Sequence, residues 1–183
     1  MRPGQSRYVR SQGGYTLVEL IVASAIGLMV MTGLTSVVLS AWRANTVATS
    51  RIEASGQIRN FQFQAYDDFA LSTLPVPSGC SATENSPCTT PIVLQGVQAS
   101  NATPPAISPY QVTYTWDGVG LLERQTRVGA NSPVNFDSAT GVTAFSWYLD
   151  GTPPNQTVVV NISITVQSYV ETQALRFYPR VNP

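Results

Sequence analysis

The stretch YTLVELIVASAIGLMVMTGLTSVVLSAW, residues 15–42, decides how this chain is built. From Leu20 to Ala41 it runs for 22 residues without a charged side chain. As an α-helix this run would be about 33 Å long, enough to cross a hydrocarbon core of roughly 30 Å. Trp42 follows where an interfacial aromatic anchor would lie, and Arg43 comes next. We therefore predict a transmembrane helix over residues 15–42.

The residues before this stretch are basic and polar. Residues 1–14 contain Arg2, Arg7 and Arg10 and no acidic residue, so the positive-inside rule predicts a cytoplasmic N-terminus and an exported C-terminal part. An ordinary secretory signal cleaved near Ala25 is disfavoured, because the apolar run continues well past that point. The sequence thus indicates a single-pass protein of the inner (cytoplasmic) membrane with an extracytoplasmic head.

Glu19 is the only charged residue between positions 15 and 42. A carboxylate at the centre of a bilayer costs on the order of 3 kcal/mol, and less near the interface. In one interpretation Glu19 lies solvated at headgroup level in a plain membrane anchor. In the other it is retained for a partner. Glu19 taken alone favours neither interpretation.

The residues around Glu19 resemble the processing motif of the type IV prepilin family. Residues 13–20, GGYTLVEL, match its Gly, its aromatic residue and its Thr-Leu-x-Glu-Leu sequence, which leads into a transmembrane helix. The resemblance extends from Gly14 to about Ala41. It departs from the family pattern in two places: Tyr15 replaces the usual Phe, and Ser36 stands where a helix-bending Pro is frequent.

This resemblance implies a role for three residues. Gly14 would precede the bond cut by prepilin peptidase, so residues 1–14 would be a cleaved basic leader. Tyr15 would become the new N-terminal residue and be N-methylated. Glu19 would pair with the N-terminal amine of a neighbouring subunit during filament assembly. Such pairing is physically reasonable, because an amine or a carboxylate alone is costly in a low-dielectric environment.

Apolar residues at helical spacing continue beyond Trp42. This pattern predicts an amphipathic helix continuation over residues 43–74, so that one helix would run from Thr16 to Thr73. Pro75 and Pro77 would end it. The predicted apolar face consists of Val47, Ala54, Ile58, Phe61, Ala65 and Phe69.

Residues 75–109 are rich in Pro, Ser, Thr, Asn and Gly, which predicts a loop with room for one short strand at residues 92–97. Cys80 and Cys88 lie in this segment. In an exported segment we expect them to be oxidised to a disulfide that closes a small loop. Redox or metal chemistry is disfavoured, because no basic residue lies nearby to activate a thiol.

Residues 110–183 show the alternation of an antiparallel β-sheet head. Asp117-Gly118 is a hairpin signal, and Pro179 marks the last segment as an edge strand. A long helix followed by hairpins gives an α+β fold, pilin-like, with the helix packed on an antiparallel sheet of about four strands. The segments with strand character are residues 110–116, 119–128, 142–149, 156–167 and 172–178.

The composition removes several classes of enzyme and metal site. The chain has 183 residues, ten basic and ten acidic, and a formal net charge of zero. All ten basic residues are Arg, and there is no Lys or His. A Ser-His-Asp triad, a His metal site and a Walker lysine therefore lack their residues, and two cysteines are too few for an all-thiolate zinc site. We expect no enzymatic activity, no cofactor and no metal.

Two groups of polar residues are candidates for cation sites. Asp67 and Asp68 are adjacent on a predicted helix and would point about 100° apart, so a solvated helix end is favoured. The residues Asn135, Asp137 and Ser138 lack the regular spacing of a calcium loop, and a turn is favoured there.

Direct nucleic-acid binding is not expected. Backbone affinity for nucleic acid comes from clustered Lys and Arg. Arg124 and Arg127 have opposite strand parity, so they should face opposite sides of a sheet and make no basic patch.

Short pieces of the C-terminal part resemble minor pilins and J-type minor pseudopilins of type II secretion: residues 114–116, 121–124 and 176–180. Major pilins commonly place a disulfide near the C-terminus, whereas both cysteines here precede the sheet. The resemblance implies a low-copy minor pilin or pseudopilin that initiates or caps a type IV pilus or a type II secretion pseudopilus.

Its implied partners are other pilin or pseudopilin subunits, prepilin peptidase, the inner-membrane assembly platform and membrane lipid. Two alternatives stay open. One is a competence pseudopilin that assists DNA uptake, and the other is a single-pass membrane-tethered extracytoplasmic binding domain.

Overall fold

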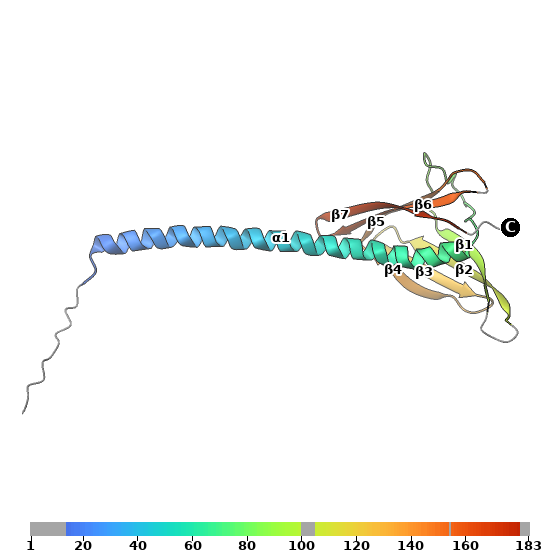
Figure 1. The fold of residues 1–183 in the computed structure, drawn as a ribbon, viewed down its shortest axis with the longest axis horizontal. Coiled ribbons are helices and arrows are strands. Elements are labelled where there is room, and N and C mark those ends of the chain that lie inside the picture. Colours follow the sequence, from blue (N-terminus) through green and yellow to red (C-terminus); the bar gives the residue numbers. More distant parts are fainter. Residues whose placement is uncertain (1–13, 100–104, 154, 180–183) are drawn as a thin grey trace, which may run out of the picture. The chain divides into compact units, whose positions relative to one another are not determined.

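The computed structural model describes residues 14–99, 105–153 and 155–179 (Figure 1). The predicted basic leader, apart from Gly14, lies outside these residues, as does Arg180 in one of the minor-pilin-like pieces. The chain divides into two units, one up to Thr46 and one from Val47 onward. Helix α1 belongs to both.

Helix α1 (Leu17–Leu71) is 55 residues long, which confirms the prediction of one long helix within two residues at each end. Every residue from 14 to 45 is exposed. Helix α1 is long and apolar enough to cross a membrane. An apolar surface on all sides of a helix is typical of a segment that is covered by lipid or by neighbouring helices.

From Val47 onward α1 is amphipathic. The predicted apolar face is confirmed at five of its six positions. Val47 is the exception, because it is 54% exposed and precedes Ser50, the first helix residue that the head buries. The buried residues of α1 are Ser50, Ala54, Ile58, Phe61, Ala65, Asp68 and Phe69.

The head contains more strands than predicted, and they form two sheets instead of one. All neighbouring strands are antiparallel, in the orders β1-β2-β3-β4 and β5-β6-β7. Their bounds are β1 (Ile92–Ala99), β2 (Ile107–Trp116), β3 (Leu121–Val128), β4 (Val134–Thr140), β5 (Val142–Asp150), β6 (Thr157–Val166) and β7 (Tyr169–Phe177).

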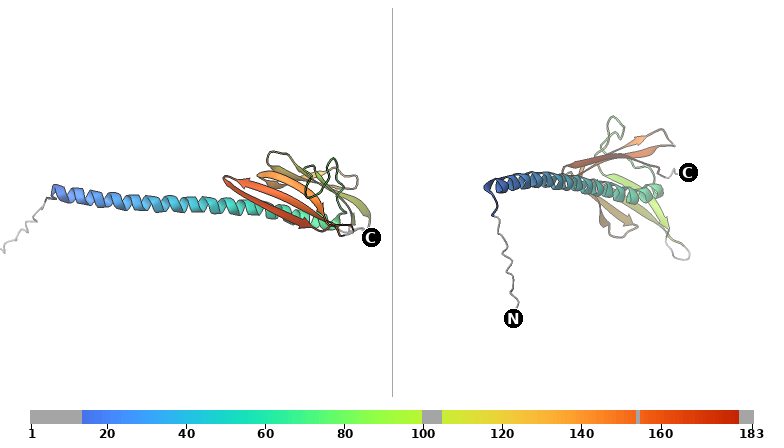
Figure 2. Two further views of the ribbon diagram at one scale, coloured as in Figure 1. Left: turned by 90° about the horizontal axis from the view of Figure 1, so that it is seen from above. Right: turned by 60° about the vertical axis from the view of Figure 1, so that its left-hand side comes forward.

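The second half of α1 runs between these two sheets (Figures 1 and 2). The ring of Phe61 lies edge-on to Tyr114 of β2, Phe145 of β5 and Phe177 of β7, with ring centroids 5.4, 6.3 and 6.1 Å apart. Phe69 stacks on Phe177 at 4.4 Å. One helix face therefore fills the core shared by both sheets.

Strand β4 was not predicted, and the turn expected at residues 135–138 is wrong. β4 pairs with β3 and is an edge strand, so several of its side chains face water. The alternation of apolar residues in its sequence is therefore weak. Side chains of α1 cover part of its outer edge. Asn60 Nδ2 donates to the Ser138 carbonyl at 2.9 Å, and Gln57 Oε1 accepts the Thr140 N–H at 3.1 Å.

Gly141 carries the chain from one sheet to the other. It follows β4 directly and precedes β5, with φ +71°, a conformation that favours glycine. A Cβ atom there would lie 2.8 Å from the Thr165 carbonyl oxygen. Because this turn redirects the chain, residues 134–150 belong to two sheets instead of extending one.

The predicted loop over residues 75–109 contains the whole of β1 and the start of β2, which pair as a hairpin from Ile92↔Tyr114 to Ala99↔Ile107. Gly96 of β1 lies against the end of α1, where a Cβ atom would approach the Leu71 carbonyl oxygen to 2.4 Å. Thr73 N–H donates to the Gln95 carbonyl at 2.8 Å. The helix end is thus tied to β1.

Asp117 organises the β2–β3 hairpin turn, as its sequence predicted. Its Oδ1 accepts the backbone N–H groups of Val119, Gly120 and Leu121 at 2.8, 2.8 and 2.9 Å. These hydrogen bonds stabilise the ionised carboxylate and lower the pKa of Asp117 from its ordinary value of 3.8.

Candidate functional site

The first candidate site is the start of α1. Gly14, Tyr15 and Thr16 are not helical, and Tyr15 is 85% exposed. Thr16 caps the helix: its hydroxyl accepts the Glu19 N–H at 3.3 Å, and its carbonyl accepts the Leu20 N–H at 3.2 Å. The bond between Gly14 and Tyr15 therefore lies in exposed backbone outside the helix.

Glu19 occupies the third helical position after the Thr16 cap. This is the spacing of a capping box, and a negative charge in the first helical turn interacts favourably with the helix dipole. Glu19 is exposed, and within the described part of the chain its carboxylate has no hydrogen-bond or ion-pair partner. The carboxylate is thus available one helical turn beyond Tyr15.

A second surface lies on the outward face of α1 within the head. Ile52, Phe63 and Tyr66 are 73%, 79% and 68% exposed. Together with Gly56, Arg59 and Ala70 they follow alternating spacings of four and three residues, which places them on one helix face opposite the buried one. Sequence reasoning missed this face, although its apolar members recur at helical spacing.

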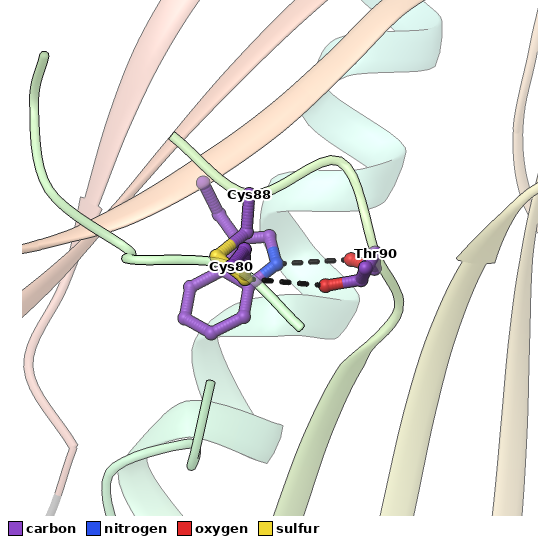
Figure 3. Close-up of a disulfide and its surroundings, with 4 residues drawn as sticks. Cys80, Cys88 and Thr90 are labelled. Carbon is purple, nitrogen blue, oxygen red and sulfur yellow. Dashed lines mark hydrogen bonds between the residues drawn. A yellow bond between two sulfur atoms is a disulfide. The ribbon is translucent and has the colours of Figure 1, made fainter. Parts of the chain in front are cut away.

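The disulfide between Cys80 and Cys88 confirms the expected pairing, with Cα atoms 5.4 Å apart (Figure 3). Cys88 lies along β5: its N–H donates to the Trp147 carbonyl at 2.8 Å, and the Trp147 N–H donates back at 2.9 Å. The Trp147 indole also donates to the Thr90 carbonyl at 3.0 Å. The disulfide loop therefore covers an edge of the second sheet.

A buried polar cluster joins the end of α1 to the first sheet. Asp68 is 2% exposed, so the prediction of a solvated helix end is wrong for this residue. Arg124 donates two hydrogen bonds of 2.7 Å to its carboxylate, and the hydroxyls of Tyr110 and Tyr114 donate at 2.8 and 2.5 Å. Each carboxylate oxygen of Asp68 therefore accepts one hydrogen bond from the charged Arg124 and one from a neutral tyrosine hydroxyl.

Burial is the largest cause that raises the pKa of both phenols, Tyr110 and Tyr114, above the ordinary value of 10, and the adjacent Asp68 charge raises it further. The hydrogen bonds to Asp68 likewise raise the pKa of Arg124. Both tyrosines therefore stay neutral donors, and Arg124 stays positively charged, across ordinary pH.

The remaining candidate residues are dispersed. Asp67 and Asp137 are exposed, and no group of three or more His, Cys, Asp or Glu side chains in the described ranges could hold a metal ion. Arg127 is exposed while Arg124 is held by Asp68, which agrees with their opposite strand parity.

Comparison with known proteins identifies the N-terminal segment. Residues 9–35 match the family model described as the prokaryotic N-terminal methylation motif, the signature of type IV prepilin-like proteins. The matched segment includes Gly14, Tyr15 and Glu19 and enters the apolar part of α1. Comparisons with curated proteins and with solved structures gave no match. The match confirms the resemblance seen in the sequence.

Proposed function

We propose that this chain is a minor pilin or pseudopilin subunit that is assembled into, or primes, a type IV pilus or a type II secretion pseudopilus. The observation that carries the proposal is the N-terminal methylation motif at residues 9–35, which leads directly into an exposed apolar helix. A plain membrane anchor needs the apolar span but not the motif.

In this proposal the peptidase cuts after Gly14, and Tyr15 is N-methylated. Both residues lie in exposed, non-helical backbone, which suits access by an enzyme. Cleavage creates an amine four residues before Glu19, whose carboxylate has no partner among the described residues. Pairing of that amine with Glu19 of a neighbouring subunit would remove two costly isolated charges and favour one axial register.

The head would lie outside the cytoplasm and the leader inside it. An oxidised Cys80–Cys88 pair fits an oxidising compartment. The position of this disulfide before most of the sheet, and the short pieces that resemble J-type pseudopilins, favour a minor over a major subunit. Its partners would then be other pilin or pseudopilin subunits, the peptidase and the assembly platform.

The proposal is tested by expressing the full chain with and without a prepilin peptidase and measuring the mass of the product. We expect the loss of residues 1–14 and the gain of one methyl group on Tyr15. Gly14→Val should block cleavage, because a branched side chain replaces hydrogen beside the scissile bond. Gly13→Ala is the matched control and should be cut. If the wild-type chain were not cut, the proposal would be contradicted, and a membrane-tethered binding domain would remain as the alternative.

A further inference from the structure

A groove lies between the outward side of α1 and strand β4. It has a volume of about 340 Å³, at the lower end of the range of roughly 300–1,000 Å³ that is typical of small-ligand pockets. Phe63 of α1 and Phe136 of β4 both line it and are 79% and 50% exposed. Two exposed phenylalanines on one concave surface are unusual, because large apolar side chains normally gain free energy by burial.

The groove carries a net negative charge. Asp67, Asp68 and Arg124 also line it. Arg124 is neutralised by its two hydrogen bonds to Asp68, and its side chain is only 17% exposed. Asp67 is exposed, and its carboxylate has no hydrogen bond or ion pair within the described ranges. One uncompensated carboxylate therefore lies beside two aromatic rings.

We propose that this groove binds an arginine side chain of a partner protein. A guanidinium stacks on aromatic faces and at the same time forms bidentate hydrogen bonds with a carboxylate. An apolar side chain would cover the two rings but would leave the Asp67 carboxylate without a counter-charge. An anionic group would meet the Asp67 charge. Charge complementarity thus selects a cation, and the pair of rings selects a planar one.

The rigid surroundings favour this use. Asp68, next to Asp67, is held by four hydrogen bonds from Arg124, Tyr110 and Tyr114. Gln64, which also lines the groove, accepts the Ser138 hydroxyl at 2.9 Å and so connects α1 to β4. Asp68 and Gln64 are therefore held in place before a partner arrives, which lowers the entropy lost on binding.

The inference does not rest on filament assembly, because a membrane-tethered binding domain would present the same groove. It is tested with N-acetyl-arginine amide as the probe, titrated into the full isotope-labelled chain in detergent micelles. The readout is the chemical shift of the amides of Phe63, Asp67 and Phe136. The neutral isostere N-acetyl-citrulline amide is the matched ligand control.

We expect saturable shifts at these three residues, with millimolar affinity, and binding about ten-fold weaker for citrulline. Asp67→Asn should weaken arginine binding about five-fold and remove its salt dependence. Glu123→Gln, an acid on β3 that does not line the groove, is the matched protein control and should bind as wild type.

Three results would overturn the proposal. The first is the absence of shifts at tens of millimolar probe. The second is equal binding of citrulline, or an Asp67→Asn variant that binds arginine as tightly as wild type, since either would mark the groove as a merely apolar surface. The third is self-association of the chain that Asp67→Asn abolishes, which would assign the groove to a second copy.

Discussion

The two halves of α1 differ in the distribution and burial of their apolar side chains, although they form one continuous helix. Up to Thr46 its side chains are apolar on every side, and almost all are exposed. From Val47 onward one face is buried between two sheets, and the opposite face, which includes Ile52, Phe63 and Tyr66, is exposed. Helical periodicity thus marks where a helix packs on its own head, and its absence marks where the helix needs an external apolar environment.

The largest expected effect of a substitution distinguishes the buried face from the exposed face in the second half of α1. Phe61→Ala should lower the free energy of unfolding of the head by about 4 kcal/mol, because Phe61 is fully buried and contacts three aromatic rings. Phe63→Ala, two residues away but exposed, should change it by less than about 0.5 kcal/mol. Denaturant unfolding of the chain in micelles measures both. Equal losses would contradict the assignment of faces.

The second effect concerns the buried polar cluster. Asp68→Asn should cost about 3 kcal/mol of unfolding free energy, since it leaves the mostly buried Arg124 charge without its counter-ion. Asp67→Asn removes an exposed carboxylate at the neighbouring position and should be nearly neutral for stability. If the two variants unfolded alike, the ion pair would not be what fixes the end of α1 to the first sheet.

A smaller loss is expected from the disulfide. Cys80→Ser with Cys88→Ser should reduce the stability of the head by about 2–3 kcal/mol, because the unfolded chain regains the entropy of an open loop. A reducing agent should lower the unfolding midpoint of the wild type and leave that of the double variant unchanged. The helix content up to Thr46, followed by amide exchange, should not respond to either treatment.

The smallest effect should come from Asp117. Its pKa is lowered on folding, so its contribution to stability is present above its ordinary pKa of 3.8 and is lost as the pH falls through the folded value. Asp117→Asn should therefore lower the urea midpoint slightly at neutral pH, and this difference should shrink as the pH falls and the wild-type carboxyl becomes protonated. A constant difference at all pH values would contradict this account.

How much the sequence revealed also differs between the two parts. The apolar run and the face of Ile58, Phe61 and Phe69 predicted α1, because helical periodicity is a local signal. The N-terminal methylation motif was equally visible, since its residues are contiguous and it combines several features.

The head was predicted less well, because its structure depends on distant pairs. Asp68 looked solvated, and its partner Arg124 lies 56 residues away. Strand β4 looked like a turn, since its partner β3 and the α1 side chains that cover its edge leave no local signal. The division into two sheets depends on the backbone conformation of Gly141, which composition and periodicity do not encode.

We propose that the carboxylate of Glu19, in the apolar half of α1, is used for filament assembly. The most direct test compares Glu19→Gln with Glu53→Gln, an exposed acid in the other half of the same helix, in cells that assemble the filament. Both variants should be cleaved after Gly14. We predict that Glu53→Gln enters the filament fraction as wild type does and that Glu19→Gln is lost from it. Recovery of Glu19→Gln at the wild-type level would contradict the account.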